Sequence, residues 1–119
     1  MDIRLKTAKF RLGDEEYDIC CNMNVLADVQ EMHGGNLGAA LDSAGTLKTV
    51  LAFLTAMIND ARDTLGLEPY SVKEVGRKVA GGKMRYMRET VMQLVTVALI
   101  SDEAAAAAEE ENEDDEKNV

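Results

Sequence analysis

A stripe of apolar residues between Thr46 and Gly66 constrains this chain more than any other part of its sequence. The apolar residues recur every three or four positions, and three polar residues mark the opposite side. The stripe consists of Leu47, Val50, Leu51, Leu54, Met57, Ile58, Ala61 and Leu65, and the polar side of Lys48, Asn59 and Arg62. This spacing predicts an amphipathic helix over residues 46–65, about 30 Å long, for which Gly66 is a natural stop. Other elements must cover the apolar side of so long a helix.

The segment before this helix predicts a β-hairpin around the sequence RLGDEEYDI. Gly13–Asp14 is a turn signal, and residues 17–21 have the pattern of a returning strand. The apolar alternation that begins at Ile3 changes phase before Phe10, which predicts a bulge or turn near Thr7–Ala8. Because an isolated hairpin is marginally stable in water, helices must cover one of its faces.

Shorter helices are predicted on both sides of the long one. Asn22 or Asn24 can cap a helix that ends at the sequence HGG, and Asn36 can start a second. Ser71 and Glu74 form a capping-box pattern at the start of a third, which Gly81–Gly82 ends.

A last helix is predicted from about Lys83 into the alanines, with one narrow polar strip of Glu89, Gln93 and Thr96. Apolar residues cover nearly all the rest of its circumference: Val91, Met92, Leu94, Val95, Val97, Ala98, Leu99 and Ile100. Two interpretations stay open, a central core helix or a helix that packs on the body with one side and on a partner with another. The candidate partner-binding residues are Leu51, Leu54, Met84, Met87, Leu94, Val95 and Leu99.

These elements predict one small domain that is mainly α with an N-terminal β-hairpin, an α+β fold. Residues 1–103 form its body, a compact bundle of about five helices packed on the hairpin, with an aliphatic core because aromatic residues are only 4% of the chain. Residues 104–119 are an alanine-rich helical extension and an acidic tail that we expect to be disordered.

The formal charge of −9 belongs to the end of the chain. Residues 101–119 hold nine of the 22 acidic residues and one of the 13 basic ones, so residues 1–100 are near neutral, with 13 acids and 12 bases. The low isoelectric point therefore says little about what the body binds. The tail is predicted to keep the protein soluble.

Nothing in the sequence predicts an enzyme, a cofactor or a metal site. His33 is the single histidine and lies at a helix end, and Gly81–Lys83 lacks the other parts of a phosphate-binding loop. The adjacent Cys20 and Cys21 are interpreted as reduced thiols of a cytoplasmic protein. The first residues lack the apolar core of a signal peptide, and no stretch of about twenty apolar residues predicts a membrane span.

A basic cluster precedes the last helix and continues into it: Arg77, Lys78, Lys83, Arg85 and Arg88. It could contact nucleic-acid phosphates, but Tyr86 is the single aromatic residue within it. The simpler interpretation of the cluster is a solvated face, or an intramolecular resting place for the acidic tail. A small nucleic-acid-binding regulator therefore stays as the alternative function.

The order of the parts resembles the tail assembly chaperones of long-tailed bacteriophages and prophages. Members often begin with a short motif of the form key-y-l, followed in order by N-x-x-L, a glutamate and a glycine. The segment EEYDICCNMNVLADVQEMHG matches this pattern here. Members also carry a later helix start of the form s-x-e-E-V/L, which YSVKEVGRKV matches. The resemblance covers roughly residues 10–101 and rests on spacing and residue types.

This resemblance implies a non-enzymatic protein of the bacterial host cytoplasm. Such chaperones bind the long apolar tape-measure protein and help tail-tube subunits assemble around it. A helical tape with exposed apolar faces aggregates unless it is covered. Tape-measure protein and tail-tube protein are therefore the expected partners, with self-association possible and no membrane.

Overall fold

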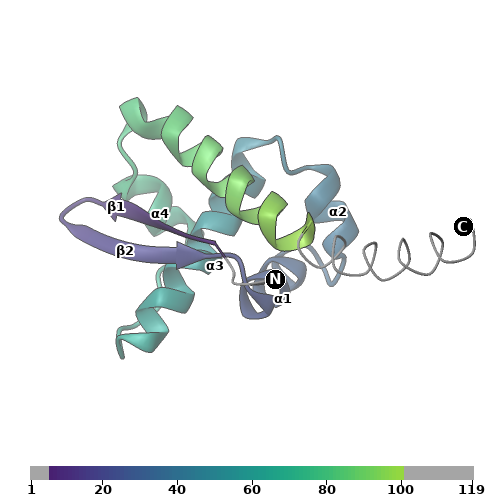
Figure 1. Ribbon diagram of the computed structural model, residues 1–119, viewed down its shortest axis with the longest axis horizontal. Helices are drawn as coiled ribbons and strands as arrows, with labels where there is room; N and C mark the ends of the chain where they lie inside the picture. The colour runs from purple at the N-terminus through teal and green to yellow at the C-terminus, as the bar shows by residue number, and fades with distance from the viewer. Residues whose placement is uncertain (1–5, 101–119) are drawn as a thin grey trace, which may run out of the picture.

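The computed structural model describes residues 6–100 of the chain, which form a mainly helical fold with a two-stranded antiparallel hairpin at its start (Figure 1). The predicted fold class is confirmed. The extension and tail, residues 104–119, lie outside the described residues. Within residues 6–100, no helix has the length and apolar character that crossing a bilayer requires.

The hairpin pairs β1 (Thr7–Leu12) with β2 (Glu15–Cys20) around a two-residue turn. Gly13, the first turn residue, has a φ of 63°. Asp14, the second, has a negative φ, because only glycines have a positive φ in the described part of the chain. This combination is typical of a type II′ turn. The register runs without interruption from Thr7 opposite Cys20 to Leu12 opposite Glu15, so no bulge lies within these strands. The predicted bulge near Thr7–Ala8 is therefore wrong as far as the described pairing extends.

The helix bounds follow from the capping side chains that the sequence offers. Asn22, rather than Asn24, accepts a hydrogen bond from the Val25 N–H at 3.0 Å and starts α1 (Met23–Met32). Asn36 does the same for α2 (Leu37–Asp42), and Thr46 for α3 (Leu47–Thr64). The complete Ser71–Glu74 capping box starts α4 (Val72–Lys78), which the short 3₁₀ turn η1 (Gly81–Lys83) follows.

The central helix of the molecule is α3, and not the last helix. Every α3 residue from 49 to 58 is buried except Leu51, because β2, α1 and α4 all pack on α3. Of its predicted polar side, Lys48 is exposed and Asn59 is half-buried. Arg62 is only 8% exposed, which contradicts its placement on a solvated face.

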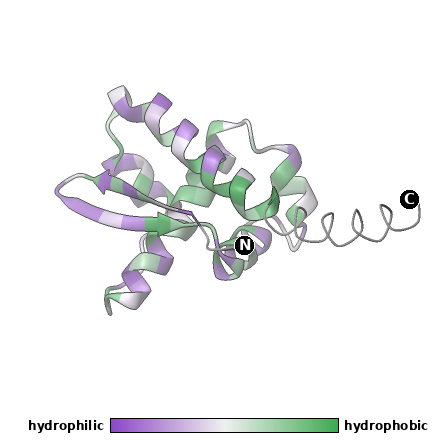
Figure 2. Ribbon diagram, viewed as in Figure 1, coloured by the Kyte–Doolittle hydropathy of each residue, from purple (hydrophilic) through white to green (hydrophobic). Residues whose placement is uncertain are grey.

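Residues 84–100 form the last helix, which has one buried and one exposed side. Its first turn is fixed to β1, since Tyr86 stacks on Phe10 with the ring centroids 5.8 Å apart and donates a hydrogen bond to the Lys9 carbonyl at 2.8 Å. The predicted polar strip is exposed, and Figure 2 shows the helix becoming more apolar towards its end. The buried side consists of Met87, Thr90, Val91, Leu94, Val95 and Ala98. A central core position for this helix is therefore excluded, and its contact with a partner stays a prediction.

Candidate protein-binding surface

The seven predicted partner-binding residues divide into core and surface. Four are at most 3% exposed, so a partner cannot touch them while the body keeps this structure: Leu54, Met87, Leu94 and Val95. Leu51 and Leu99 are half-buried against the core, and Met84 is 48% exposed. Surface contact is therefore possible at Leu51, Met84 and Leu99.

A small apolar hollow brings three of the seven together at the C-terminal end of α4. We call it the α4–η1 hollow; its volume is about 120 Å³. Leu47 and Met84, 42% and 48% exposed, lie at its mouth. The other lining residues are Leu51, Gly76, Val79, Ala80, Gly81 and Met87. The sequence analysis named Leu51, Met84 and Met87 as candidates but did not predict the cavity, because residues of α4 and η1, distant in the chain from Leu47 and Leu51, complete it.

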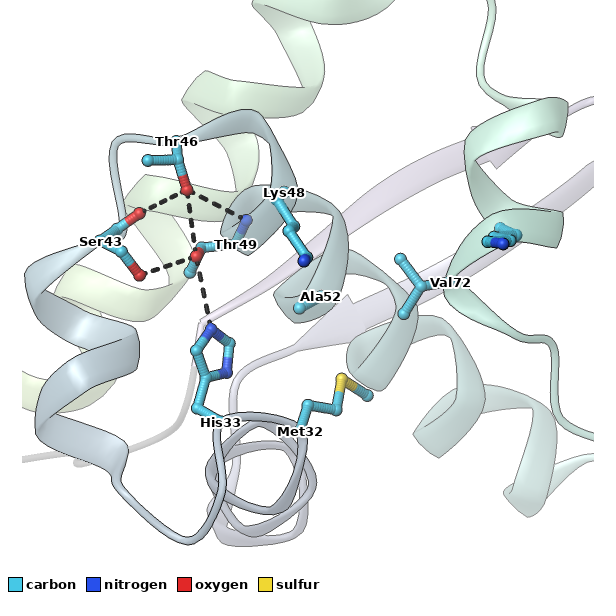
Figure 3. A pocket seen from close by; sticks show the side chains of 9 residues that line it. Met32, His33, Ser43, Thr46, Lys48, Thr49, Ala52 and Val72 are labelled. Atoms are coloured by element: carbon cyan, nitrogen blue, oxygen red, sulfur yellow. Dashed lines mark hydrogen bonds between the residues drawn. The ribbon is translucent and has the colours of Figure 1, made fainter.

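A larger hollow, which sequence reasoning missed, lies where the end of α1, the start of α3 and the start of α4 meet (Figure 3). We call it the α1–α3 groove; its volume is about 540 Å³. Met32, 44% exposed, comes from α1 and the half-buried Val72 from α4, and Lys48 and Ala52 come from α3 beside them. The groove is lined by Met32, His33, Ser43, Thr46, Lys48, Thr49, Ala52, Val72 and Lys73.

Hydrogen bonds hold one wall of this groove together. The Thr49 hydroxyl, on a residue only 2% exposed, lies 2.9 Å from the Ser43 hydroxyl and 3.5 Å from His33 Nε2. The Thr46 hydroxyl donates to the Ser43 carbonyl at 2.8 Å. His33 Nδ1 lies 2.9 Å from the Val29 carbonyl, to which its N–H donates. His33 thus lies at the C-cap of α1, and its ring nitrogens contact the Val29 carbonyl and the Thr49 hydroxyl, which links the end of α1 to the wall of the groove.

The basic cluster is spread over three elements. Arg77 and Lys78 end α4, Lys83 ends η1, and Arg85 and Arg88 lie in the first turns of the last helix. Two of these charges already have partners within the chain.

Arg85 pairs with Glu89 at 3.0 Å, and the Lys78 ammonium lies 5.2 Å from the Tyr70 ring centroid. Tyr86, the one aromatic residue in the cluster, is stacked on Phe10 and hydrogen-bonded to β1. Its ring is therefore committed to a contact inside the protein, which weakens the case for base stacking.

A polar network around Arg62 ties the hairpin to α3 and to the following loop. Arg62 Nη1 donates to the Tyr17 hydroxyl at 2.7 Å and to Glu15 at 3.0 Å, and its guanidinium lies 3.9 Å from the Tyr70 ring centroid. Tyr70 donates to Glu15 at 2.6 Å, and Asn59 holds the Tyr70 backbone through two hydrogen bonds.

The hydrogen bonds of this network fix the protonation states of Glu15 and Tyr70. Hydrogen bonds from Tyr17 and Tyr70 lower the pKa of Glu15, while the Glu15 hydrogen bond and burial raise the pKa of Tyr70 to about 12. Glu15 therefore stays a carboxylate and Tyr70 a neutral donor at neutral pH. We interpret the network as structural, because each polar group is occupied by another member.

The remaining groups do not assemble a metal or redox centre in the described residues. No group of three His, Cys, Asp or Glu side chains in residues 6–100 is placed to hold a metal ion. Cys20 and Cys21 are free thiols, and burial raises the pKa of Cys21 to about 11, which keeps this thiol protonated and unreactive.

The surface features that remain for a function are the α4–η1 hollow, the α1–α3 groove and the exposed part of the basic cluster. The hollow is lined by apolar side chains and glycines, and the groove combines Met32, Ala52 and Val72 with polar side chains. Hollows with apolar surface can receive side chains of another protein. Comparison of the chain with protein-family models, with curated proteins and with solved structures gave no match.

Proposed function

We propose that this protein is a phage tail assembly chaperone that covers apolar helical surface of the tape-measure protein and aids recruitment of tail-tube subunits. The observation that carries the proposal is the exposure of long apolar side chains beside two hollows, at Leu47, Met84 and Met32, in a body whose core is complete without them. Clustered exposed apolar residues mark interaction sites. Two of the three are methionines, whose flexible side chains adapt to varied apolar partners.

The position of α4 favours a helical partner. The α1–α3 groove is lined by Val72 at the start of α4, and the α4–η1 hollow by Gly76 and Val79 at its end. Seven helical residues span roughly 10 Å. A partner helix lying along α4 can therefore place side chains seven positions apart in the two hollows. A tape-measure helix with a regular apolar stripe has that spacing.

The resemblance of the sequence supplies the identity of the partner and the role in tail-tube recruitment. The resembled residues include the capping box of α4, and Val72 and Lys73 within it line the α1–α3 groove. The nucleic-acid alternative has less support, because Tyr86 is engaged with β1 and Arg85 with Glu89. A salt-dependent gel shift with the purified chain tests that alternative directly.

Co-expression with the tape-measure protein encoded beside this gene tests the proposal. We expect the tape-measure protein to be soluble and to co-purify with the chain, and to aggregate without it. A Leu47→Asp/Met84→Asp variant should lose co-purification, because it places two charges at the mouth of the α4–η1 hollow. Met23→Asp is the matched control, since Met23 is 68% exposed and lines neither hollow. A tape-measure protein that aggregates equally with and without the chain contradicts the proposed function.

A further inference from the structure

We propose that the α1–α3 groove docks an amphipathic helix whose apolar stripe is flanked by acidic side chains, and that Lys48 and Lys73 select this helix by charge. The inference rests on the proposed function and narrows the bound segment of the tape-measure protein to one of this chemistry.

The floor of the groove is formed by apolar side chains. Met32, Ala52 and Val72 present aliphatic and thioether surface from three different helices. Such a floor accepts one or two large aliphatic side chains of a partner helix. It does not by itself distinguish one apolar helix from another.

The hydroxyl groups of the groove do not provide that discrimination either. Ser43 donates to backbone carbonyls of α2, Thr46 to the Ser43 carbonyl, and Thr49 lies within hydrogen-bond distance of Ser43, Thr46 and His33. Because their hydrogen-bonding capacity is used inside the wall, the wall is rigid and offers a partner mainly its shape.

The charges that remain on the groove are both positive. Lys48 and Lys73 are exposed, no carboxylate lines the groove, and no ion pair to either lysine occurs within residues 6–100. A partner helix with Asp or Glu beside its apolar stripe finds complementary charges here, and one with Lys or Arg meets repulsion.

A third hollow on the body has the opposite charge to the α1–α3 groove. It is lined by Asp28, Asp60 and Asp63 together with Leu67 and Pro69, and its residues come from α1, the end of α3 and the loop after it. An acidic helix is repelled there and attracted to the α1–α3 groove. The charges of these two hollows therefore favour the α1–α3 groove over the aspartate-lined hollow for an acidic helix.

Two designed helical peptides of about 21 residues test the inference, because this length spans about 30 Å. Both carry leucines at helical spacing, flanked by glutamates in one and by lysines in the other. Fluorescence anisotropy with the full chain should give at least about tenfold tighter binding of the glutamate peptide, since two exposed ion pairs are replaced by two repulsions. The preference should shrink at high salt.

A charge-swap variant makes the test specific to this groove. Lys48→Glu/Lys73→Glu should invert the preference in favour of the lysine peptide. The matched control Lys6→Glu/Arg11→Glu changes the same number of exposed charges at and beside β1, outside the groove and the α4–η1 hollow, and should keep the preference. Unchanged thermal melts establish that the variants fold. Equal binding of both peptides by the unmodified chain, or an unaltered preference in the charge-swap variant, overturns the inference.

Other occupants of the groove give different outcomes. If the glutamate peptide binds only after residues 109–119 are deleted, the groove holds the chain's own acidic segment and the inference is overturned. Self-association that the charge-swap variant abolishes overturns it in favour of a second copy. If the tape-measure protein still co-purifies undiminished with the charge-swap variant, the groove assignment fails and the proposed function stands. If that protein never binds the unmodified chain, the proposed function fails.

Discussion

Replacing Arg62 by methionine should destabilise the protein without touching its apolar core. The side chains are similar in length, so the change removes the guanidinium and keeps most of the packing. Four contacts disappear: the hydrogen bonds to Tyr17, Glu15 and the Glu68 carbonyl, and the stacking over Tyr70.

The expected loss follows from the burial of the two charged partners. The Arg62 side chain is 10% exposed, but that of Glu15 is 38% exposed. Removing one partner of a fully buried ion pair costs about 3–5 kcal/mol, because the other charge is left without a partner. Glu15 can turn to water and keeps the Tyr17 and Tyr70 hydroxyls, so the cost is reduced for solvent screening. We expect the free energy of unfolding to fall by about 2 kcal/mol, a large part of a stability of about 5–15 kcal/mol.

Urea unfolding followed by circular dichroism measures this loss. Arg88→Met is the matched control, because Arg88 is exposed, and a surface change of this kind alters stability by no more than about 0.5 kcal/mol. Arg62→Lys should recover only part of the loss, since an ammonium cannot donate to Tyr17, Glu15 and the Glu68 carbonyl in the same fork geometry. An Arg62→Met variant as stable as the control would refute the role assigned to this network.

Three further predictions concern the core, the ionisation of the network and the tail. Leu94→Asp should unfold the protein, whereas Leu99→Asp, at a half-buried position of the same helix, should lower the melting temperature less. Thermal melts measure both effects, and equal effects would contradict the burial of this helix. Hydrogen bonds from Tyr17 and Tyr70 lower the pKa of Glu15 from its usual value of 4.5. Ionised Glu15 therefore stabilises the fold at a pH above 4.5, and this contribution is lost as the pH falls through the lowered pKa. Glu15→Gln should therefore flatten the acid side of a stability-against-pH curve, and an unchanged slope would count against it. Deleting residues 109–119 should leave the melting temperature unchanged and lower the solubility, measured as the concentration at which the protein precipitates.

The resemblance and the surfaces support the proposed function in different ways. The resemblance names a partner and a stage of assembly, while the hollows give a place where an apolar helix can be covered. The tests above separate the identity of the partner from the place where it binds.

Local signals in the sequence determined the elements of the fold. The caps at Asn36 and Ser71 and the turn at Gly13 were predicted, because each depends on hydrogen bonds or backbone angles within a few residues. The same holds for the extent of α3, whose apolar spacing and Gly66 stop are properties of one continuous segment.

The tertiary structure alone decided which elements lie at the centre and which surfaces stay open. Arg62 has the spacing of a solvated residue, yet it is buried because Glu15 and Tyr17, 47 and 45 positions away, complete its hydrogen bonds. The α1–α3 groove joins Met32 to Val72, which no sequence period relates. Helical periodicity predicts which side chains must be buried, but it does not predict which distant segment packs on them. The last helix and α3 were therefore both predicted as apolar, and only packing showed that α3 takes the central place.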